Sequence, residues 1–447
     1  MMDGNNKSVF SKASWRILLI FGLVGQIAWS VENMYFNLFV FETISPNLNA
    51  VTLMVQLSGI VATVVTLFAG ALSDKMGNRR TFISAGYTIW GVTVALFGFL
   101  SPDTVDALFS TGEYRAVSVC LVLVIVGDCV MTLFGSSAND AAFNAWVTDN
   151  TTEANRGRIE GIVAILPLIA MLIVAGGFGI LVSLIGYRLL FLILGIIISG
   201  AGIFGFFNIK DSHTLAKTDL SSDVFYGFRP RAIRENPIFY IALIIVLIYG
   251  ISCQIFMPYM IIYMKTYLSF SVVEYSVVFG LAILLGAAVN LYLTRLSDRK
   301  DKSRLLYFAA AVMALGLVGM YLSKGESKVA NLILFGIFGF VMIVGYIFIS
   351  ALSGSIIRDN TPEGAVGKLQ GVRMVFAVLI PMVVGPLIGN AINKARNIPI
   401  PDIDSPDTMT TLYIPAPEIF LAAAGFLVTV FLVIPFLVRK TGKNLNK

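Results

Sequence analysis

The stretch Val147–Gly161, VTDNTTEANRGRIEG, recurs 210 residues later as Ile357–Gly371, IRDNTPEGAVGKLQG. Six residues keep their identity in the second copy, and Arg158 becomes Lys368, which retains the positive charge. Each copy is a polar turn between two long apolar runs. Because the offset is close to half of the 447 residues, the chain consists of two related halves. A function of such a chain depends on the interface between the halves or on the differences between them.

The composition is that of a membrane protein. Apolar residues make up 57% of the chain and charged residues 13%, against about 25% charged residues in a soluble domain. Runs of about 20 apolar residues span the hydrocarbon core as helices. We predict twelve such spans, at residues 15–41, 51–72, 81–100, 116–146, 159–183, 187–208, 237–264, 272–294, 304–322, 330–356, 368–392 and 416–438.

The lysines and arginines determine the predicted orientation. With the N-terminus in the cytoplasm, the inner segments hold 25 of the 32 basic residues. This asymmetry predicts an even number of spans with both termini cytoplasmic. The predicted domains are a cytoplasmic N-terminus at 1–14, a six-helix bundle at 15–208, a cytoplasmic linker at 209–236, a second six-helix bundle at 237–438 and a cytoplasmic C-terminus at 439–447.

Two loops face the outside in this topology. Residues 102–113 form an acidic loop, and residues 393–418 form a loop with five prolines. We expect the second loop to be a solvated linker, with a cap over the entrance as the alternative.

Several classes of function have no support in the residues. The three cysteines lie inside apolar spans without the spacing of a disulfide framework or a metal site. The single histidine, His213, lies in a polar loop, and no P-loop pattern occurs. The basic residues are spread over the loops rather than gathered in one domain. We therefore expect no metal, cofactor, nucleic acid or enzymatic activity.

The loop between the second and third spans carries a recognisable motif. It reads GALSDKMGNRR at Gly70–Arg80 and is partly repeated as TRLSDR at Thr294–Arg299. With twelve spans in two halves, the chain resembles the major facilitator superfamily. The resemblance implies two bundles that rock about a central site, a functional monomer, and inner loops that latch the inner side. The predicted gating residues are Gly70, Asp74, Arg79, Arg80, Arg158, Asp298 and Arg358. Positive-inside topology alone explains the basic members, but not the recurring acidic ones.

The fourth span narrows the resemblance. Its NDAAFNAWV stretch at Asn139–Val147 is similar to the cation-coupled glycoside–pentoside–hexuronide symporters, whose Asp-x-x-Phe pattern is matched by Asp140 and Phe143. Sodium-dependent members of that group use two aspartates on the second span. Here the second span offers only Gln56, Ser58, Thr63 and Thr66, which favours a proton over sodium as the coupling ion.

Apart from glutamates in the first three residues of a span, the carboxyl side chains within predicted spans are Glu32 in the first, and Asp128 and Asp140 in the fourth. A charged side chain at mid-membrane costs about 2.5–3.5 kcal/mol, so it is retained when it is paired, hydrated or used. The positions equivalent to the two aspartates in the second half are Phe338 and Ser350, which indicates that the first half carries the ion chemistry. A desolvated carboxyl takes up and releases a proton, as a coupling site must. Hydrogen bonding between helices is the alternative role.

A polar stripe runs along the first span. Gln26, Ser30, Asn33 and Asn37 lie within about 60° of one another at 100° per residue. Amides beside aromatic rings suit a polyhydroxylated ligand, although polar side chains also join helices in membranes. The predicted substrate-binding residues are Gln26, Asn33, Asn37, Asn139, Asn144 and Trp146 in the first half and Gln254, Tyr259 and Tyr346 in the second.

These observations predict an all-α membrane protein of the bacterial cytoplasmic membrane that acts as a secondary active transporter by alternating access. The favoured reaction is proton-coupled import of a sugar or glycoside, so the expected partners are a small-molecule substrate, a coupling cation and the lipid bilayer. The alternative is efflux or flipping of an amphipathic compound, such as a drug or a lysolipid.

Overall fold

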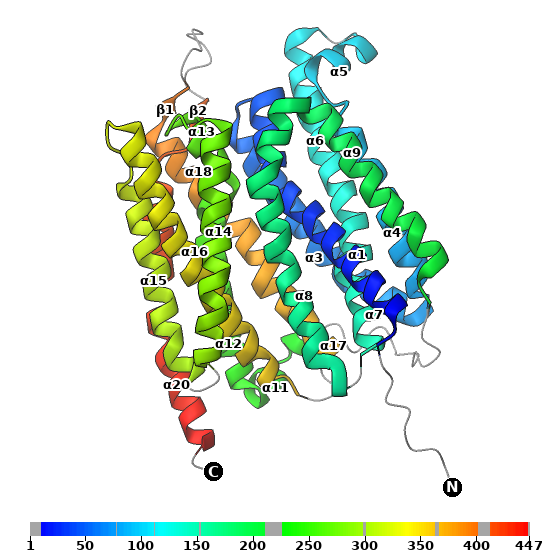
Figure 1. Ribbon diagram of the computed structural model, residues 1–447, viewed down its shortest axis with the longest axis vertical. Coiled ribbons are helices and arrows are strands. Elements are labelled where there is room, and N and C mark those ends of the chain that lie inside the picture. Colours follow the sequence, from blue (N-terminus) through cyan, green and yellow to red (C-terminus); the bar gives the residue numbers. More distant parts are fainter. Residues whose placement is uncertain are drawn as a thin grey trace.

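The computed structural model describes residues 10–76, 78–110, 112–151, 153–210, 226–297, 301–362, 366–400 and 412–445. Long helices run side by side from one end of the molecule to the other (Figure 1). The described part of the chain begins and ends at the same end of the molecule, which we call the termini end, and we call the opposite end the far end.

The first half contains six spans. The first span is interrupted by two π-helical turns, and the fourth and fifth by one each. In chain order the elements are α1 (Lys12–Val31), η1 (Glu32–Phe36), α2 (Asn37–Phe39), η2 (Val40–Ile44), α3 (Leu48–Met76), α4 (Arg79–Phe97), α5 (Pro102–Phe109), α6 (Glu113–Gly135), η3 (Ser136–Phe143), α7 (Asn144–Asp149), α8 (Glu153–Ile173), η4 (Val174–Phe178) and α9 (Gly179–Asn208).

The second half repeats this plan and ends in two short strands and a final broken span. Its elements are η5 (Tyr226–Phe228), α11 (Pro230–Glu235), α12 (Pro237–Phe256), η6 (Met257–Tyr259), α13 (Met260–Thr266), α14 (Val272–Ser297), α15 (Lys302–Leu322), α16 (Lys328–Asp359), α17 (Val366–Met374), η7 (Val375–Leu379), α18 (Ile380–Arg396), β1 (Ile398–Pro399), β2 (Tyr413–Ile414), α19 (Glu418–Val428) and α20 (Val430–Leu445).

The count of spans agrees with the twelve that were predicted. The described residues contain ten separate apolar helical segments long enough to cross a membrane, and α4 with α5 makes an eleventh. One of the ten, Ile165–Asn208, has 44 residues, about 66 Å of helix at 1.5 Å per residue, and the hydrocarbon core is about 30 Å thick. Gly186 breaks this segment with φ 74° and ψ 164°, a conformation that glycine adopts without strain. The chain therefore crosses twice within this segment.

The two outer loops differ from the prediction. Residues 102–109 form the short helix α5, which is bent by 92° from α4 and begins with Ser101 accepting a hydrogen bond from the Thr104 backbone N–H. In the loop at 393–418, β1 pairs with β2, and Tyr413 is buried with its hydroxyl 2.9 Å from Asn390 Oδ1. The expectation of a solvated linker is therefore wrong for the described part of this loop, while residues 401–411 lie outside the described residues.

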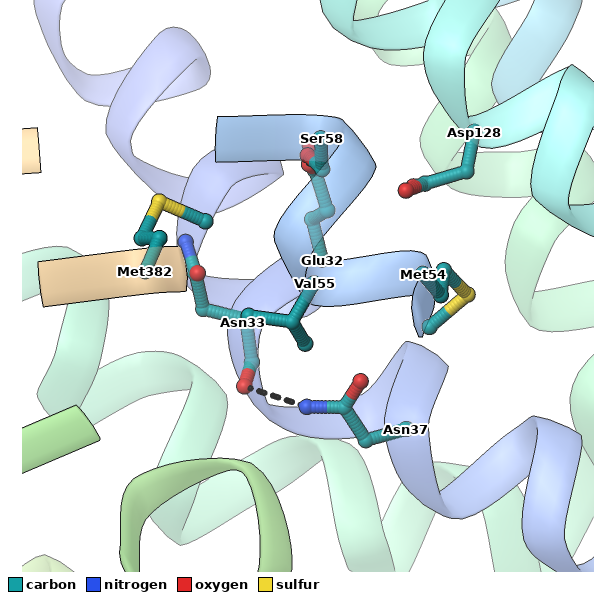
Figure 2. A pocket seen from close by; sticks show the side chains of 8 residues that line it. All are labelled: Glu32, Asn33, Asn37, Met54, Val55, Ser58, Asp128 and Met382. Atoms are coloured by element: carbon teal, nitrogen blue, oxygen red, sulfur yellow. Dashed lines mark hydrogen bonds between the residues drawn. The ribbon is translucent and has the colours of Figure 1, made fainter. Parts of the chain in front are cut away.

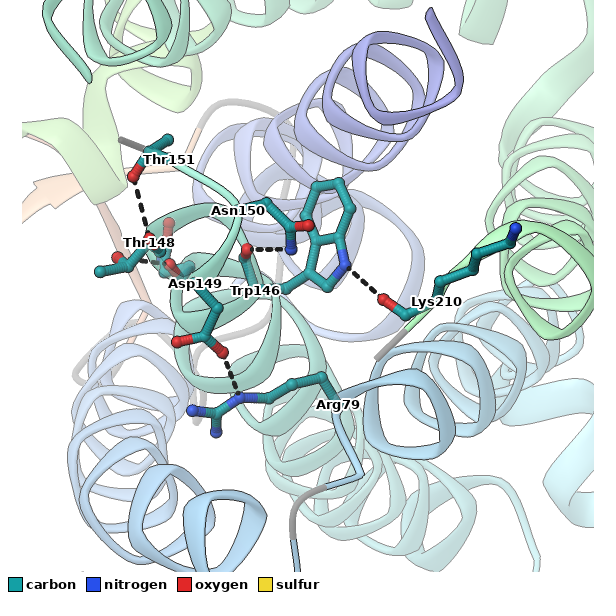
Figure 3. A network of polar contacts seen from close by, with 8 residues as sticks. Arg79, Trp146, Thr148, Asp149, Asn150, Thr151 and Lys210 are labelled. Atoms are coloured by element: carbon teal, nitrogen blue, oxygen red, sulfur yellow. Dashed lines mark hydrogen bonds and ion pairs between the residues drawn. The ribbon is translucent and has the colours of Figure 1, made fainter. Parts of the chain in front are cut away.

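The repeated polar turn has the same structural role in both halves. In the first half, Arg79 Nε lies 3.2 Å from Asp149 Oδ2 (Figure 3). In the second half, Lys302 Nζ lies 2.7 Å from Asp359 Oδ2. Each pair joins the end of the fourth span of its half to the start of the third, at the termini end. The recurring aspartate thus joins the third and fourth spans in each half.

The two pairs differ in exposure, which gives a stability prediction with an internal control. The Arg79 side chain is 5% exposed, whereas that of Lys302 is 32% exposed. Asp149→Asn is expected to lower the free energy of unfolding by about 3 kcal/mol, because it removes the negative charge that pairs with the buried Arg79 guanidinium. Asp359→Asn is expected to cost less than about 1 kcal/mol. Thermal unfolding of both variants in detergent micelles measures the difference, and equal losses would contradict it.

Candidate functional site

Glu32 is held by side chains from two neighbouring helices. It opens η1, where its backbone N–H bonds to both Ala28 O and Trp29 O, and such π-helical turns are frequent at functional sites. Ser58 Oγ of α3 donates a hydrogen bond of 2.8 Å to Glu32 Oε1. Thr132 Oγ1 of α6 donates one of 3.2 Å to the same oxygen. One carboxyl oxygen therefore links the first, second and fourth spans.

This carboxyl faces a small cavity between the two halves. Met382 of α18 contributes one wall, and the other lining residues come from the first, second and fourth spans (Figure 2). The cavity has a volume of about 10 Å³, which is room for about one water molecule and far less than the roughly 300 Å³ of a typical small-molecule pocket. The lining residues are Glu32, Asn33, Asn37, Met54, Val55, Ser58, Asp128 and Met382.

The cavity presents oxygen acceptors and no basic side chain. Glu32 Oε2, Asn37 Oδ1 and Asp128 Oδ1 are buried without a hydrogen-bond partner among the described residues. The amide nitrogens do not face these oxygens, because Asn33 Nδ2 donates to Trp29 O at 2.8 Å and Asn37 Nδ2 donates to Asn33 O at 3.1 Å. Two uncompensated negative charges in such a place are strongly unfavourable. A proton or another cation must therefore neutralise at least one of the two carboxyls.

Two of the three predicted coupling residues lie together in the structure, and the third lies apart from them. Glu32 and Asp128 line the same cavity, and their residues are 7% and 2% exposed. Asp140 lies in η3, outside the lining but within electrostatic range of Glu32. Its Oδ1 accepts a hydrogen bond from Asn139 Nδ2 at 3.1 Å, and Tyr87 OH lies 2.8 Å from Asn139 Oδ1. Among the described residues, no cluster of three or more histidine, cysteine or acidic side chains is arranged to hold a metal ion.

The predicted substrate residues of the first half are scattered. Asn33 and Asn37 line the cavity, whereas Gln26 is half-buried in α1 and does not. Asn144 is exposed, and its Nδ2 donates to Asp140 O at 3.1 Å. Trp146 is not among the residues that line this cavity. Its indole is buried against the parallel ring of Phe143, and Nε1 donates to Lys210 O (Figure 3).

The predicted substrate residues of the second half also have different surroundings. Tyr259 is fully buried, and its hydroxyl lies 2.7 Å from Thr52 Oγ1 and 2.9 Å from Pro386 O, so it bridges the halves and is not in the cavity lining. Tyr346 is half-buried, and its ring meets that of Tyr249 edge to face at 6.2 Å. Gln254 is half-buried where α12 passes close to Gly385 of α18.

Four of the predicted gating residues lie outside the part of the chain whose surroundings the structure describes: Gly70, Asp74, Arg158 and Asp298. Arg79 pairs with Asp149, and Arg80 Nη2 donates to Phe206 O at the end of α9, so both arginines join spans within the first half. Arg358 is exposed in the last turn of α16.

A set of contacts between the halves at the far end was missed by sequence reasoning. Lys265 Nζ pairs with Glu42 Oε1 across the halves, and Tyr187 OH, from the same half as Glu42, donates to Glu42 Oε2 at 2.9 Å. Asn390 Nδ2 donates to Asn49 Oδ1 at 2.8 Å. These residues come from loops and helix ends, where no periodic pattern indicates a partner. The contacts close the far end between the two bundles.

The Glu42–Lys265 pair gives a prediction about this closure. Lys265→Glu places two carboxylates together and is expected to shift the balance away from far-end closure by about 1–2 kcal/mol, since the pair is partly exposed. The double variant Glu42→Lys/Lys265→Glu restores the attraction and should regain most of the transport rate. Rates of substrate uptake for both single variants and the double variant test this. A double variant as slow as the worse single variant would exclude a direct interaction.

Comparisons with known proteins agree with this architecture. A family model described as Major Facilitator Superfamily matches residues 18–386. No curated protein matches the sequence. Similar solved structures include a bacterial homolog of the human lysosomal transporter Spinster, inward-facing and unoccupied, with TM-score 0.69 and 13% identity over 96% of this chain and 98% of that chain. The nucleoside transporter NupG is similar with TM-score 0.63 and 14% identity over 95% of this chain and 98% of that chain.

At 13% and 14% identity, the similar solved structures support the fold alone. None of the matches assigns the chain to the glycoside–pentoside–hexuronide group, so membership of that group remains a prediction. The family match covers most of the chain and agrees with the two six-span halves. The chain therefore belongs to the Major Facilitator Superfamily, which makes it a membrane-embedded secondary transporter that works by alternating access, and not an enzyme.

Proposed function

We propose that the protein imports a sugar or glycoside together with a proton, and that Glu32 and Asp128 form the coupling site. The observation that carries this proposal is the cavity between the halves, which holds two carboxyls and no basic residue among its lining. A proton neutralises one of them at low cost. As the halves rock, the site faces one side of the membrane and then the other, so the proton is taken up on one side and released on the other.

The position of the carboxyls also supports a proton. Both lie at the junction of the halves, where alternating access changes the surroundings most. The second span contributes a hydroxyl, Ser58, rather than a carboxylate. Asp140, which lies nearby and is bonded to Asn139, is the second acceptor through which the proton passes.

The substrate class is supported by the polar groups around this junction. Asn33 and Asn37 provide amide groups in the cavity lining, and the second half offers the paired rings of Tyr249 and Tyr346, which lie outside that lining. Amides hydrogen-bond to sugar hydroxyls, and rings pack on the apolar face of a sugar. The basic residues of the termini end support a cytoplasmic location of both termini, in a bacterial cytoplasmic membrane.

One observation favours efflux or flipping of an amphipathic compound instead. Met54, Val55 and Met382 make up three of the eight lining residues, and methionine adapts to varied apolar ligands. This alternative differs from import in direction and in substrate chemistry.

The test is uptake into proteoliposomes with an imposed inward proton gradient, using a panel of labelled mono- and disaccharides. Accumulation of a sugar above its external concentration, abolished when a protonophore collapses the gradient, supports the proposal. If no sugar accumulates under any gradient, and a fluorescent lysolipid or drug is moved instead, the import proposal is wrong and the alternative replaces it.

A further inference from the structure

One short segment of α3 contacts both the carboxyl site and the other half of the protein. Gln56 Nε2 donates a hydrogen bond of 2.9 Å to the backbone carbonyl of Val383 in α18. Gly59 lies against Met382 so closely that a Cβ on the glycine would be 2.6 Å from Met382 Cβ. Between these two residues, Ser58 donates to Glu32 Oε1 at 2.8 Å.

Helical geometry explains how Gln56 and Gly59 contact α18 while Ser58 contacts Glu32. At 100° per residue, Gln56 and Gly59 differ by about 60° and share the face toward α18. Ser58 points about 100° away from Gly59 and about 160° away from Gln56, toward the first and fourth spans. The segment lies in the uninterrupted helix α3. When α18 moves, α3 therefore moves with it as a rigid helix, and Ser58 is displaced relative to Glu32.

The hydroxyl group of Ser58 responds to the protonation of Glu32. Ser58 has one proton, and it donates that proton to a carboxylate oxygen or turns it toward Thr132, whose hydroxyl lies 2.9 Å away. Thr132 also donates to Glu32 Oε1. When Glu32 takes up a proton, the hydrogen bond from Ser58 becomes weaker, because a bond to a carboxylate is about twice as strong as a bond to a neutral carboxyl. The position that α3 prefers relative to Glu32 thus depends on the proton.

We propose that the segment Gln56–Gly59 couples protonation of Glu32 to the rocking of the two halves, with Gln56 and Ser58 as positioning residues. This inference rests on the proposed proton coupling at Glu32. It assigns the mechanical link to the second span, through one inter-half hydrogen bond and one close glycine contact. Neither residue needs to touch the substrate.

The experiment measures far-end opening against pH without substrate. Spin labels at the exposed positions Ser183→Cys and Glu326→Cys, one on each half, report the distance between the halves. The background replaces the three native cysteines with alanine. In this background with no further change, the distance distribution is expected to follow pH with one midpoint, and Glu32→Gln should abolish the response.

Variants of the segment give the decisive comparison. Ser58→Ala is expected to move the midpoint to higher pH by about one unit, a tenfold change in proton affinity, and Ser58→Thr should restore it. Gln56→Met keeps the length of the side chain but removes the donor, and it should reduce the pH-dependent change in distance by more than about fivefold, the effect of losing roughly 1 kcal/mol of coupling. Thr63→Val is the matched control, because among the described residues this hydroxyl bonds to Gly59 O on its own helix and to no residue of another helix.

The outcomes separate the inference from the proposed function. If Glu32→Gln abolishes the pH response while Ser58→Ala and Gln56→Met titrate like the labelled background, the coupling role of the segment is overturned and proton coupling stands. If the labelled background does not respond to pH, both proposals are wrong. If Ser58→Ala fails to fold, Gln56→Met, whose partner is a backbone carbonyl, still decides the result.

Discussion

Glu32→Gln is expected to abolish uphill accumulation of substrate in proteoliposomes. The glutamine keeps the shape of the side chain and the hydrogen bonds from Ser58 and Thr132, but it cannot exchange a proton. A gradient of two pH units stores about 2.7 kcal/mol per proton, enough for roughly 100-fold accumulation with one proton per substrate. The variant should equilibrate substrate to a ratio of about 1, the limit when no proton energy is coupled.

Counterflow exchange provides the control for this prediction. Exchange of internal for external substrate needs alternating access but no net proton movement, so Glu32→Gln should retain it. Asp140→Asn separates the roles of the carboxyls, because Asp140 does not line the cavity, and we expect it to slow accumulation without abolishing it. Full accumulation by Glu32→Gln would contradict the coupling role and would leave Glu32 only a structural role, the hydrogen bonds that join three helices.

Gly280→Val is expected to block far-end closure. Gly176 in η4 and Gly280 in α14 bring the two halves into backbone contact, and a Cβ on Gly280 would lie 3.3 Å from Gly176 Cα. The γ-carbons of valine have no room there, so the helices must separate. Overpacking of this kind costs about 1–3 kcal/mol, which lowers the population of the closed state by about 5- to 150-fold. The uptake rate should fall by a similar factor, with normal expression of the protein.

Two glycine variants control for size and position. Gly280→Ala needs a shift of only a few tenths of an ångström and should keep most of the transport rate. Gly200→Val adds the same bulk to a glycine of α9 whose Cβ would meet nothing within 4 Å. Normal transport by Gly280→Val would show that the glycine contact is not part of the closed state.

The overall architecture was predictable because it follows from local properties of the chain. The length of each apolar run sets the number of spans, and the recurrence of the Asp149 turn at Asp359 defines the halves. The break between the fifth and sixth spans was also visible, since Gly186 interrupts the apolar run there. The short helix α5 was missed, because polar and acidic residues are equally common in loops and in the first turn of a helix.

The site was only partly predictable, because contacts between helices depend on how each helix is rotated against its neighbours. The spacing of residues on one helix shows which share a face, but not what covers that face. Glu32 and Asp128 were therefore identified singly, and their shared cavity was not foreseen. For the same reason Trp146 and Tyr259 were assigned to the substrate, although one packs against Phe143 and the other bridges the halves.

The central claim is that substrate and proton cross together through the carboxyl site. The most direct measurement uses proteoliposomes filled with a pH-sensitive dye and no imposed gradient, to which a transported sugar is added. We expect the interior to acidify as the sugar enters with the wild-type protein, and sugar to enter without acidification with Glu32→Gln. Sugar influx without acidification in the wild type, or equal acidification in both proteins, would contradict the account.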